Sequence, residues 1–235
     1  AAADEKSRQK ILKRYTWKAY LEAEETIREK TEDMLKHYLA HIYPNGFKAQ
    51  VVAVSREAAI RYKKAFDALL ANEIWITGFL DHLQKETGIT VDREQFKNFR
   101  AEVVISRSLN DKPEMKPFTD ETKHDEIIKS FKQPFGKTSD SGIRGDVGII
   151  IVQSMLLTGF DAPVEQVMYL DDLIKEHNLL QAIARVNRID KHKEAGFIID
   201  YVGITKHLRE ALSAFEDKDT DEIFKVFKDE SRDLD

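Results

Sequence analysis

An amphipathic segment with two arginines is the part of the sequence best suited to chemistry. Residues 177–191 read HNLLQAIARVNRIDK. On a helix that turns about 100° per residue, Gln181, Arg185 and Arg188 fall within an arc of roughly 60°, and Val186 lies on the apolar side. Arginine is planar and always charged, so it can hold a phosphate through two hydrogen bonds. The helix alone leaves two interpretations open, an ordinary solvated face or a pair of anion-binding arginines.

A second candidate site lies at a junction between an apolar run and a helical segment. Ser55 and Arg56 follow the apolar run 49–54 and precede the segment REAAIRYKKAFDALLAN. Serine is a favoured helix cap, and the free amide groups at a helix start favour a phosphate. A plain capping residue explains Ser55 equally well, so this motif is weak by itself.

A third candidate follows the apolar run 147–153, in the stretch SMLLTGFDAP. Gly159 allows a ligand to approach the backbone closely, and Thr158 offers a hydroxyl and an amide group. Asp161 follows, and Pro163 stiffens the exit from the loop. An ordinary loop with a turn glycine is the competing interpretation.

The apolar runs predict the fold that positions these residues. They are apolar at consecutive positions, which is typical of strands buried on both faces, and they alternate with helical segments. This pattern predicts an α/β fold with an open, mostly parallel sheet covered by helices on both faces, with sites at the carboxyl ends of the strands. The expected strands are 49–54, 101–106, 147–153, 164–171 and 195–202.

Three segments are expected along the chain. Residues 1–45 form a helical lead-in, because residues 4–42 are rich in helix formers and contain no glycine or proline. Residues 46–204 form the α/β unit. Residues 205–235 form a C-terminal, helical and acidic segment.

Composition excludes several classes of protein. The chain has 235 residues, no cysteine and a net charge of −5. Without cysteine there is no disulfide framework and no thiolate zinc site. No apolar run is long enough to cross a membrane, and the first ten residues lack the apolar core of a signal peptide. The absence of cysteine fits a reducing cytoplasm. Residues 216–235 carry nine acidic and four basic residues, so the remaining body is neutral and can still carry a basic groove.

Two stretches imitate a nucleotide-hydrolysis site without completing one. FGKTSD at 135–140 ends like a phosphate-binding loop, but Phe131 stands where the pattern needs its first glycine, and a helical segment precedes it. We therefore interpret FGKTSD as a surface loop. VMYLDD resembles a strand ending in metal-binding acids. Without a phosphate loop, Asp171 and Asp172 are interpreted as a strand-end turn, and no metal site is expected.

The order of the motifs is more specific than any one of them. Ser-Arg, then Thr-Gly-x-Asp-x-Pro, then Gln-x-x-Ala-Arg-x-x-Arg resembles motifs IV, V and VI in the second motor lobe of superfamily 2 helicases and translocases. GFKAQVVAVSREAAIRYKKAF, MLLTGFDAP, HNLLQAIARVNR and GFIIDYVGI are similar to the motor subunit (HsdR) of type I restriction enzymes. The resemblance covers about residues 30–215 and departs at Ala184, where many superfamily members have glycine.

The resemblance implies a RecA-like lobe that completes a split ATP site. ATP with Mg²⁺ would be bound mainly by a first lobe that this chain lacks. Arg185 and Arg188 would reach the terminal phosphates, with Arg188 as the arginine finger, and Gln181 would orient the attacking water or the neighbouring arginine. Asp161 and Gly159 would contact the nucleotide.

The resemblance also implies partners. Ser55, Arg56, Thr158 and Gly159 would hold phosphates of double-stranded DNA, without reading bases. The full-length subunit would be an ATP-dependent translocase and site-specific deoxyribonuclease, while this fragment alone would be inactive. Its partners would be the first motor lobe and nuclease domain of the same polypeptide and the modification and specificity subunits. No membrane partner is expected, and the complex would act in the cytoplasm of a prokaryote.

Three other interpretations are compatible with parts of the pattern. The same lobe could belong to another superfamily 2 motor, such as a type III restriction or repair translocase, with unchanged residue roles. A non-enzymatic interaction module could retain a motor-like fold, because fold does not imply function. A free-standing kinase or phosphatase is disfavoured by the missing phosphate loop and metal cluster.

Overall fold

The fold is built on one parallel sheet. The computed structural model describes residues 16–156, 160–174, 186, 193 and 195–203. Each pair of neighbouring strands is parallel, and the strand order is β2-β3-β1-β4-β5. The strands are β1 (Lys48–Ala53), β2 (Arg100–Val104), β3 (Val147–Val152), β4 (Glu165–Asp171) and β5 (Phe197–Asp200). The five strands expected from the apolar runs are confirmed.

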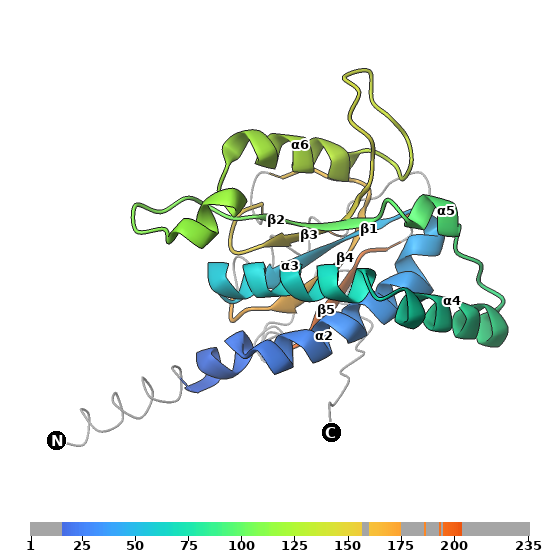
Figure 1. Ribbon diagram of the computed structural model, residues 1–235, viewed down its shortest axis with the longest axis horizontal. Coiled ribbons are helices and arrows are strands. Elements are labelled where there is room, and N and C mark those ends of the chain that lie inside the picture. Colours follow the sequence, from blue (N-terminus) through green and yellow to red (C-terminus); the bar gives the residue numbers. More distant parts are fainter. Residues whose placement is uncertain (1–15, 157–159, 175–185, 187–192, 194, 204–235) are drawn as a thin grey trace, which may run out of the picture.

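Helices surround this sheet (Figure 1). Residues 16–22 form a helix that Ala23 separates from α2, so the described part of the lead-in is helical, as expected, but interrupted. The longer helices are α2 (Glu24–His37), α3 (Arg56–Leu70), α4 (Glu73–Thr87) and α6 (Glu121–Lys132), and the short α5 spans Arg93–Phe96.

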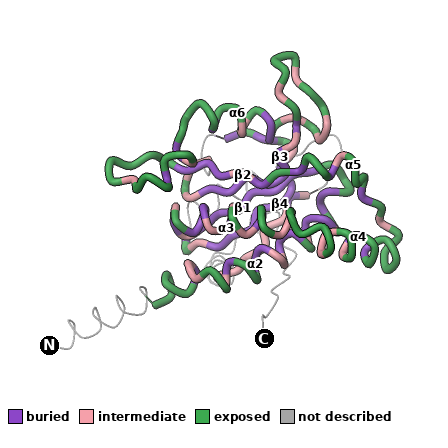
Figure 2. Tube along the Cα trace, viewed as in Figure 1, coloured by how far each residue is buried: buried purple, intermediate pink, exposed green. Residues whose placement is uncertain are grey.

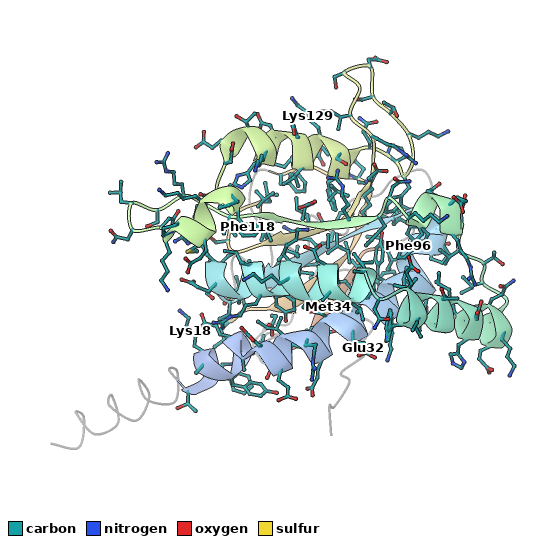
Figure 3. The ribbon with its side chains drawn as sticks, in the orientation of Figure 1. Lys18, Glu32, Met34, Phe96, Phe118 and Lys129 are labelled. Atoms are coloured by element: carbon teal, nitrogen blue, oxygen red, sulfur yellow. The ribbon has the colours of Figure 1, made fainter. Side chains whose placement is uncertain are left out.

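The two faces of the sheet bury separate apolar clusters. Val51 and Tyr169 pack with α2 and α3 in the first cluster, whereas Val52 and Met168 pack with Phe131 of α6 in the second. Figure 2 shows the buried strands between exposed helical surfaces, and Figure 3 labels Met34 on α2 and Lys129 on α6, on opposite sides of the sheet. The sheet is therefore covered on both faces, as the sequence predicts.

Local residue types explain where the helices begin. The side chains of Ser55, Asn72, Asp92 and Asp120 each accept a hydrogen bond from a backbone N–H in the first turn of the following helix. Such caps satisfy amide groups that have no partner within the helix. The connection between β2 and α6 contains a short 3-10 helix over Pro113–Phe118. The stretch at 135–140 follows α6 and lies in a loop, which confirms the interpretation of FGKTSD.

Lys48, the first residue of β1, is a buried cation that the expected strand boundary did not include. Its side chain is fully buried, and its Nζ atom donates a hydrogen bond of 3.0 Å to the Ser130 carbonyl. The same atom lies 4.7 Å from the centre of the Phe135 ring and 5.6 Å from that of Phe131. Burial lowers the pKa of Lys48 to about 7, against the opposing influence of Asp146.

This lowered pKa predicts a pH-dependent stability. Between about pH 7 and the usual lysine pKa near 10.5, the unfolded chain binds a proton that the folded chain has lost. The free energy of unfolding therefore rises with pH in this window, with a slope of up to about 1.4 kcal/mol per pH unit from this group. The variant Lys48→Met removes that contribution, so its unfolding free energy gains less over the same window.

Urea denaturation of the chain at several pH values between about 7 and 9.5 measures the difference. Lys36→Met is the matched control, because Lys36 is exposed, and its curve is expected to run parallel to that of the wild type. A parallel curve for Lys48→Met would contradict the prediction.

Candidate functional site at the carboxyl edge of the sheet

The sheet topology brings two of the predicted motifs to one edge. β1 and β3 are adjacent and parallel, and Val52 pairs with Val152 near their carboxyl ends. Ser55 follows β1, and the segment that carries Thr158 and Gly159 follows β3. Thr158 and Gly159 themselves lie outside the described residues. The ends of neighbouring parallel strands are where α/β sheets bind ligands.

Ser55 caps α3 at this edge. Its Oγ atom accepts a hydrogen bond of 3.1 Å from the backbone N–H of Ala58, and the residue is buried. The capping geometry expected from the sequence is therefore present. Contact with a DNA phosphate, the second role expected for Ser55, stays a prediction.

Arg56 has protein partners. Its guanidinium donates 2.7 Å to the Ser106 carbonyl and 2.5 Å to the Asp111 carboxylate. Asp111 also accepts a hydrogen bond of 2.9 Å from the backbone N–H of Ser108. The hydrogen bond from Arg56 lowers the pKa of Asp111, and the bond from Ser108 acts in the same direction. Arg56 thus fixes the loop after β2, a role that sequence reasoning missed because Asp111 lies 55 residues further along the chain.

The backbone after β3 adopts a costly conformation. Ser154 and Leu156 have φ angles of 60° and 62°, in the left-handed region that non-glycine residues rarely adopt. This conformation costs roughly 1–2 kcal/mol per residue, and such residues cluster where binding or catalysis requires a fixed backbone. Nothing in the sequence pattern predicted these two residues, which directly precede the Thr158-Gly159 motif.

The segments of the second and third motifs lie on the α6 face of the sheet. Asp161 is exposed, while its neighbours Phe160 and Ala162 are buried in the second apolar cluster. Val186 is helical, 1% exposed and part of the same cluster. A Cβ atom on Gly196 would lie 2.1 Å from the Val186 carbonyl oxygen, so this close packing requires glycine.

The burial of Val186 can be compared with the apolar side predicted for a helix at residues 177–191. Val186 belongs to the side expected to be apolar, and that side is buried at this residue. Gln181, Arg185 and Arg188 lie outside the described residues, so their placement stays a prediction. The structure therefore brings Val186 and the neighbours of Asp161 into one apolar cluster. Ser55 and Arg56 lie at the carboxyl edge of the sheet, after β1.

The interpretation of Asp171 as part of a turn is wrong. Asp171 is the last residue of β4 and fully buried, and its carboxylate accepts 2.5 Å from Lys30 of α2 and 2.7 Å from the Tyr62 hydroxyl of α3. Burial raises the pKa of Asp171, and the bonds from Lys30 and Tyr62 oppose that rise. Asp172 does follow the strand in a bend, and burial raises its pKa to about 6.

The described residues contain neither a cluster of metal ligands nor a membrane-spanning helix. No group of three His, Asp or Glu side chains there is arranged to hold a metal ion. Within the same residues, no helix combines the length and apolar character needed to cross a membrane.

The parallel sheet with helices on both faces defines a RecA-like, helicase-like fold. A solved fragment described as an HsdR subunit of a type I restriction enzyme from Vibrio vulnificus YJ016 has the same fold. It superposes with a TM-score of 0.52 at 17% identity, over 88% of this chain and 31% of that one.

The chain belongs to the R-subunit family of type I restriction enzymes. The model of "Type I restriction enzyme subunit R domain 3" matches residues 45–203, more than half of the chain. The MjaVIIP type I restriction enzyme endonuclease subunit of Methanocaldococcus jannaschii is 35% identical over 182 residues, or 77% of this chain. The HindI endonuclease subunit of Haemophilus influenzae is 40% identical over 117 residues, or 48% of this chain. The chain spans 15% and 10% of these two relatives.

The buried ion pair gives a stability prediction. Lys30→Met leaves the Asp171 carboxylate buried without its cation, so it is expected to lower the unfolding free energy by about 3–5 kcal/mol. Lys30→Met combined with Asp171→Leu removes both charges and is expected to recover most of that loss.

Chemical denaturation of the chain measures both effects. The matched control is Lys36→Met, which removes an exposed pair with Glu32 and is expected to change stability by about 0–0.5 kcal/mol. A loss for Lys30→Met no larger than that of the control would show that the buried pair contributes little.

Proposed function

We propose that the chain is the second motor lobe of the R subunit of a type I restriction enzyme, which translocates double-stranded DNA with energy from ATP. One observation supports the proposal: β1, which leads into Ser55 and Arg56, pairs in parallel with β3, which precedes Thr158 and Gly159 in the sequence. Membership of the R-subunit family supports the same function. The first motor lobe and the nuclease domain would belong to the same polypeptide, and the modification and specificity subunits would complete the complex.

The helix around Val186 would supply the arginines of a split ATP site. At about 100° per residue, Arg185 and Arg188 lie roughly 100° and 160° around a helix from Val186. With Val186 buried against the sheet, a helix continued through this segment would direct both arginines towards a cleft between the lobes. Arg188 acts as the arginine finger, because a preorganised guanidinium stabilises the charge on a phosphoryl group in transfer. Arg185 holds the terminal phosphates, and Gln181 orients the attacking water.

Asp161 and Gly159 would contact the nucleotide, and of these two Asp161 lies among the described residues. Asp161 presents an exposed carboxylate beside the buried Phe160, and such a group can accept hydrogen bonds from ribose hydroxyls. Gly159 allows the nucleotide close to the backbone. The described part of this lobe offers no cluster of metal ligands, so the first lobe would hold the Mg²⁺ that accompanies ATP.

The carboxyl edge would hold the DNA backbone. Ser55, Thr158 and Gly159 offer hydroxyl and amide donors to phosphates, and Arg56 offers charge while it fixes the loop through Asp111. Contacts of this kind position the duplex without reading its sequence, and they weaken as salt rises. Sequence recognition would belong to the specificity subunit.

Arg188→Ala tests the arginine finger. In the full-length subunit with its partner subunits and DNA, this variant is expected to lower DNA-stimulated ATP hydrolysis by roughly a thousandfold or more. ATP binding is expected to survive, because the finger acts on the transition state. The measurements are steady-state hydrolysis and the affinity for a fluorescent ATP analogue.

Arg93→Ala is the matched control, because Arg93 lies on the short helix α5 and its side chain is largely exposed. It is expected to hydrolyse ATP at the wild-type rate. Unchanged turnover in Arg188→Ala would refute the finger and favour a solvated face or a non-enzymatic interaction module.

Arg56→Ala and Asp111→Ala separate two roles of the Arg56 side chain. If the guanidinium contacts a DNA phosphate as proposed, Arg56→Ala weakens DNA binding by the full-length subunit and reduces the slope of log affinity against log salt by about one. Asp111→Ala releases the loop but keeps the charge, so it is expected to preserve the slope. Equal weakening with an unchanged slope in both variants would mean that Arg56 only positions the loop.

A further inference from the structure

The helical face opposite the second apolar cluster contains a groove that no described segment fills. It has a volume of about 560 Å³ and runs between α2, α3 and the start of α4. Its charged lining is mixed, with the acids Glu24, Glu29 and Glu32 on α2 and the bases Arg28, Arg61 and Lys64 on α2 and α3. Figure 3 labels Glu32 on α2. Its apolar lining consists of Ile27, Ala65, Ala68, Leu69 and Trp75.

The apolar surface continues from the groove along α4. Trp75 also lines a second hollow of about 530 Å³ with Phe79 and Ile74. The Trp75 and Phe79 rings stack 5.5 Å apart at an angle of 11°, and Ile74 is 89% exposed. Large apolar side chains gathered beside a groove mark an interaction surface. Helix-in-groove binding uses such a surface to hold the apolar face of an amphipathic helix.

The chain leaves the sheet beside this groove. The Tyr201 hydroxyl, just after β5, donates 2.5 Å to the Asp33 carboxylate of α2. At about 100° per residue, Asp33 lies roughly 100° around α2 from Glu32 and on the opposite side from Glu24. A helix is about 10–12 Å across, and four extended residues span roughly 13 Å. The residues after Gly203 can therefore cross α2 and enter the groove by about residue 208.

The sequence of that segment suits the groove. Leu208, Leu212 and Phe215 are spaced i, i+4 and i+7, which predicts one apolar stripe on a helix. Arg209 flanks the stripe, and the mixed charges of the groove lining include glutamates that can pair with it. Glu210 lies on the opposite side of such a helix, about 160° from Leu212, which leaves it in solvent.

We propose that residues 205–216 form an amphipathic helix that docks in the groove between α2, α3 and α4 of the same chain. Leu208, Leu212 and Phe215 cover the apolar lining, and Trp75 becomes buried beneath them. The docked segment fastens the C-terminal part of the chain to the lead-in helix α2. This assignment does not depend on the motor function.

Disulfide trapping tests the proposal cleanly, because the chain has no cysteine. Ala68 is exposed at the groove, so the pair Ala68→Cys with Leu212→Cys places one thiol on each surface. A disulfide requires Cα atoms about 4.4–6.8 Å apart. Under mild oxidation of the full chain, this pair is expected to form an intramolecular disulfide at least tenfold faster than the control pair Ala68→Cys with Glu210→Cys. Peptide mapping by mass spectrometry identifies the products.

Three outcomes would overturn the proposal. Equal rates for the two pairs would mean that the segment does not present a fixed face, and no disulfide in either pair would leave the groove empty of this segment. A disulfide between two chains, detected with isotope-labelled mixtures, would assign the groove to a second copy.

A second measurement covers the case in which a cysteine variant fails to fold. In a Trp17→Phe background, Trp75 reports on the groove by its fluorescence. Replacing Leu212 and Phe215 with serine is expected to shift its emission to longer wavelength, while Glu210→Ser leaves it unchanged. An unchanged emission in the first variant would also refute docking.

Discussion

The buried contact of Asp171 with Lys30 and Tyr62 is the interaction on which the arrangement of the molecule depends. It joins the carboxyl end of β4 to α2 and α3, three elements that are distant in sequence. Taking two charges out of water costs several kcal/mol per ion, so the pair is favourable only with close geometry and a further donor, which Tyr62 supplies. Because apolar packing has no direction, the pair specifies how α2 lies on the sheet. The lead-in helix α2 is consequently part of the core of the α/β unit, where Met34 and Leu35 are fully buried.

A rigid carboxyl edge follows from this arrangement. Asp171 fixes the end of β4, Ser55 caps the helix after β1, and Arg56 ties the loop after β2 to the same helix. The carboxyl ends of β4, β1 and β2 are thus held by side chains instead of by loop packing alone. For the proposed motor, such rigidity matters because phosphate contacts move DNA only if they transmit the motion of the lobe. The strained backbone at Ser154 and Leu156 belongs to the same edge and is held by the well-packed strand before it.

The strands could be predicted because each is a short run that is apolar at consecutive positions and alternates with helical segments. The cap at Ser55 could also be predicted, since capping depends on residues a few positions apart. The role of Asp171 was misjudged because its cation stands 141 residues earlier, and no local pattern reports such a distance. The partner of Arg56 was missed for the same reason. Lys48 was left outside the expected strand because a lysine is rarely fully buried, and the rings that surround it come from the distant residues Phe131 and Phe135.

The two faces of the sheet divide the proposed functions. The α6 face packs the segments of Asp161 and Val186, which would serve the nucleotide, and the opposite face carries the groove of α2, α3 and α4. β4 contributes to both faces: Met168 and Leu170 point to the α6 face, while Tyr169 and Asp171 point to the face covered by α2 and α3. A shift of β4 that moved one face would therefore move the other. The Lys30–Asp171 pair stands where such a shift would reach α2, so β4 physically connects the proposed nucleotide site on one face with the groove on the other.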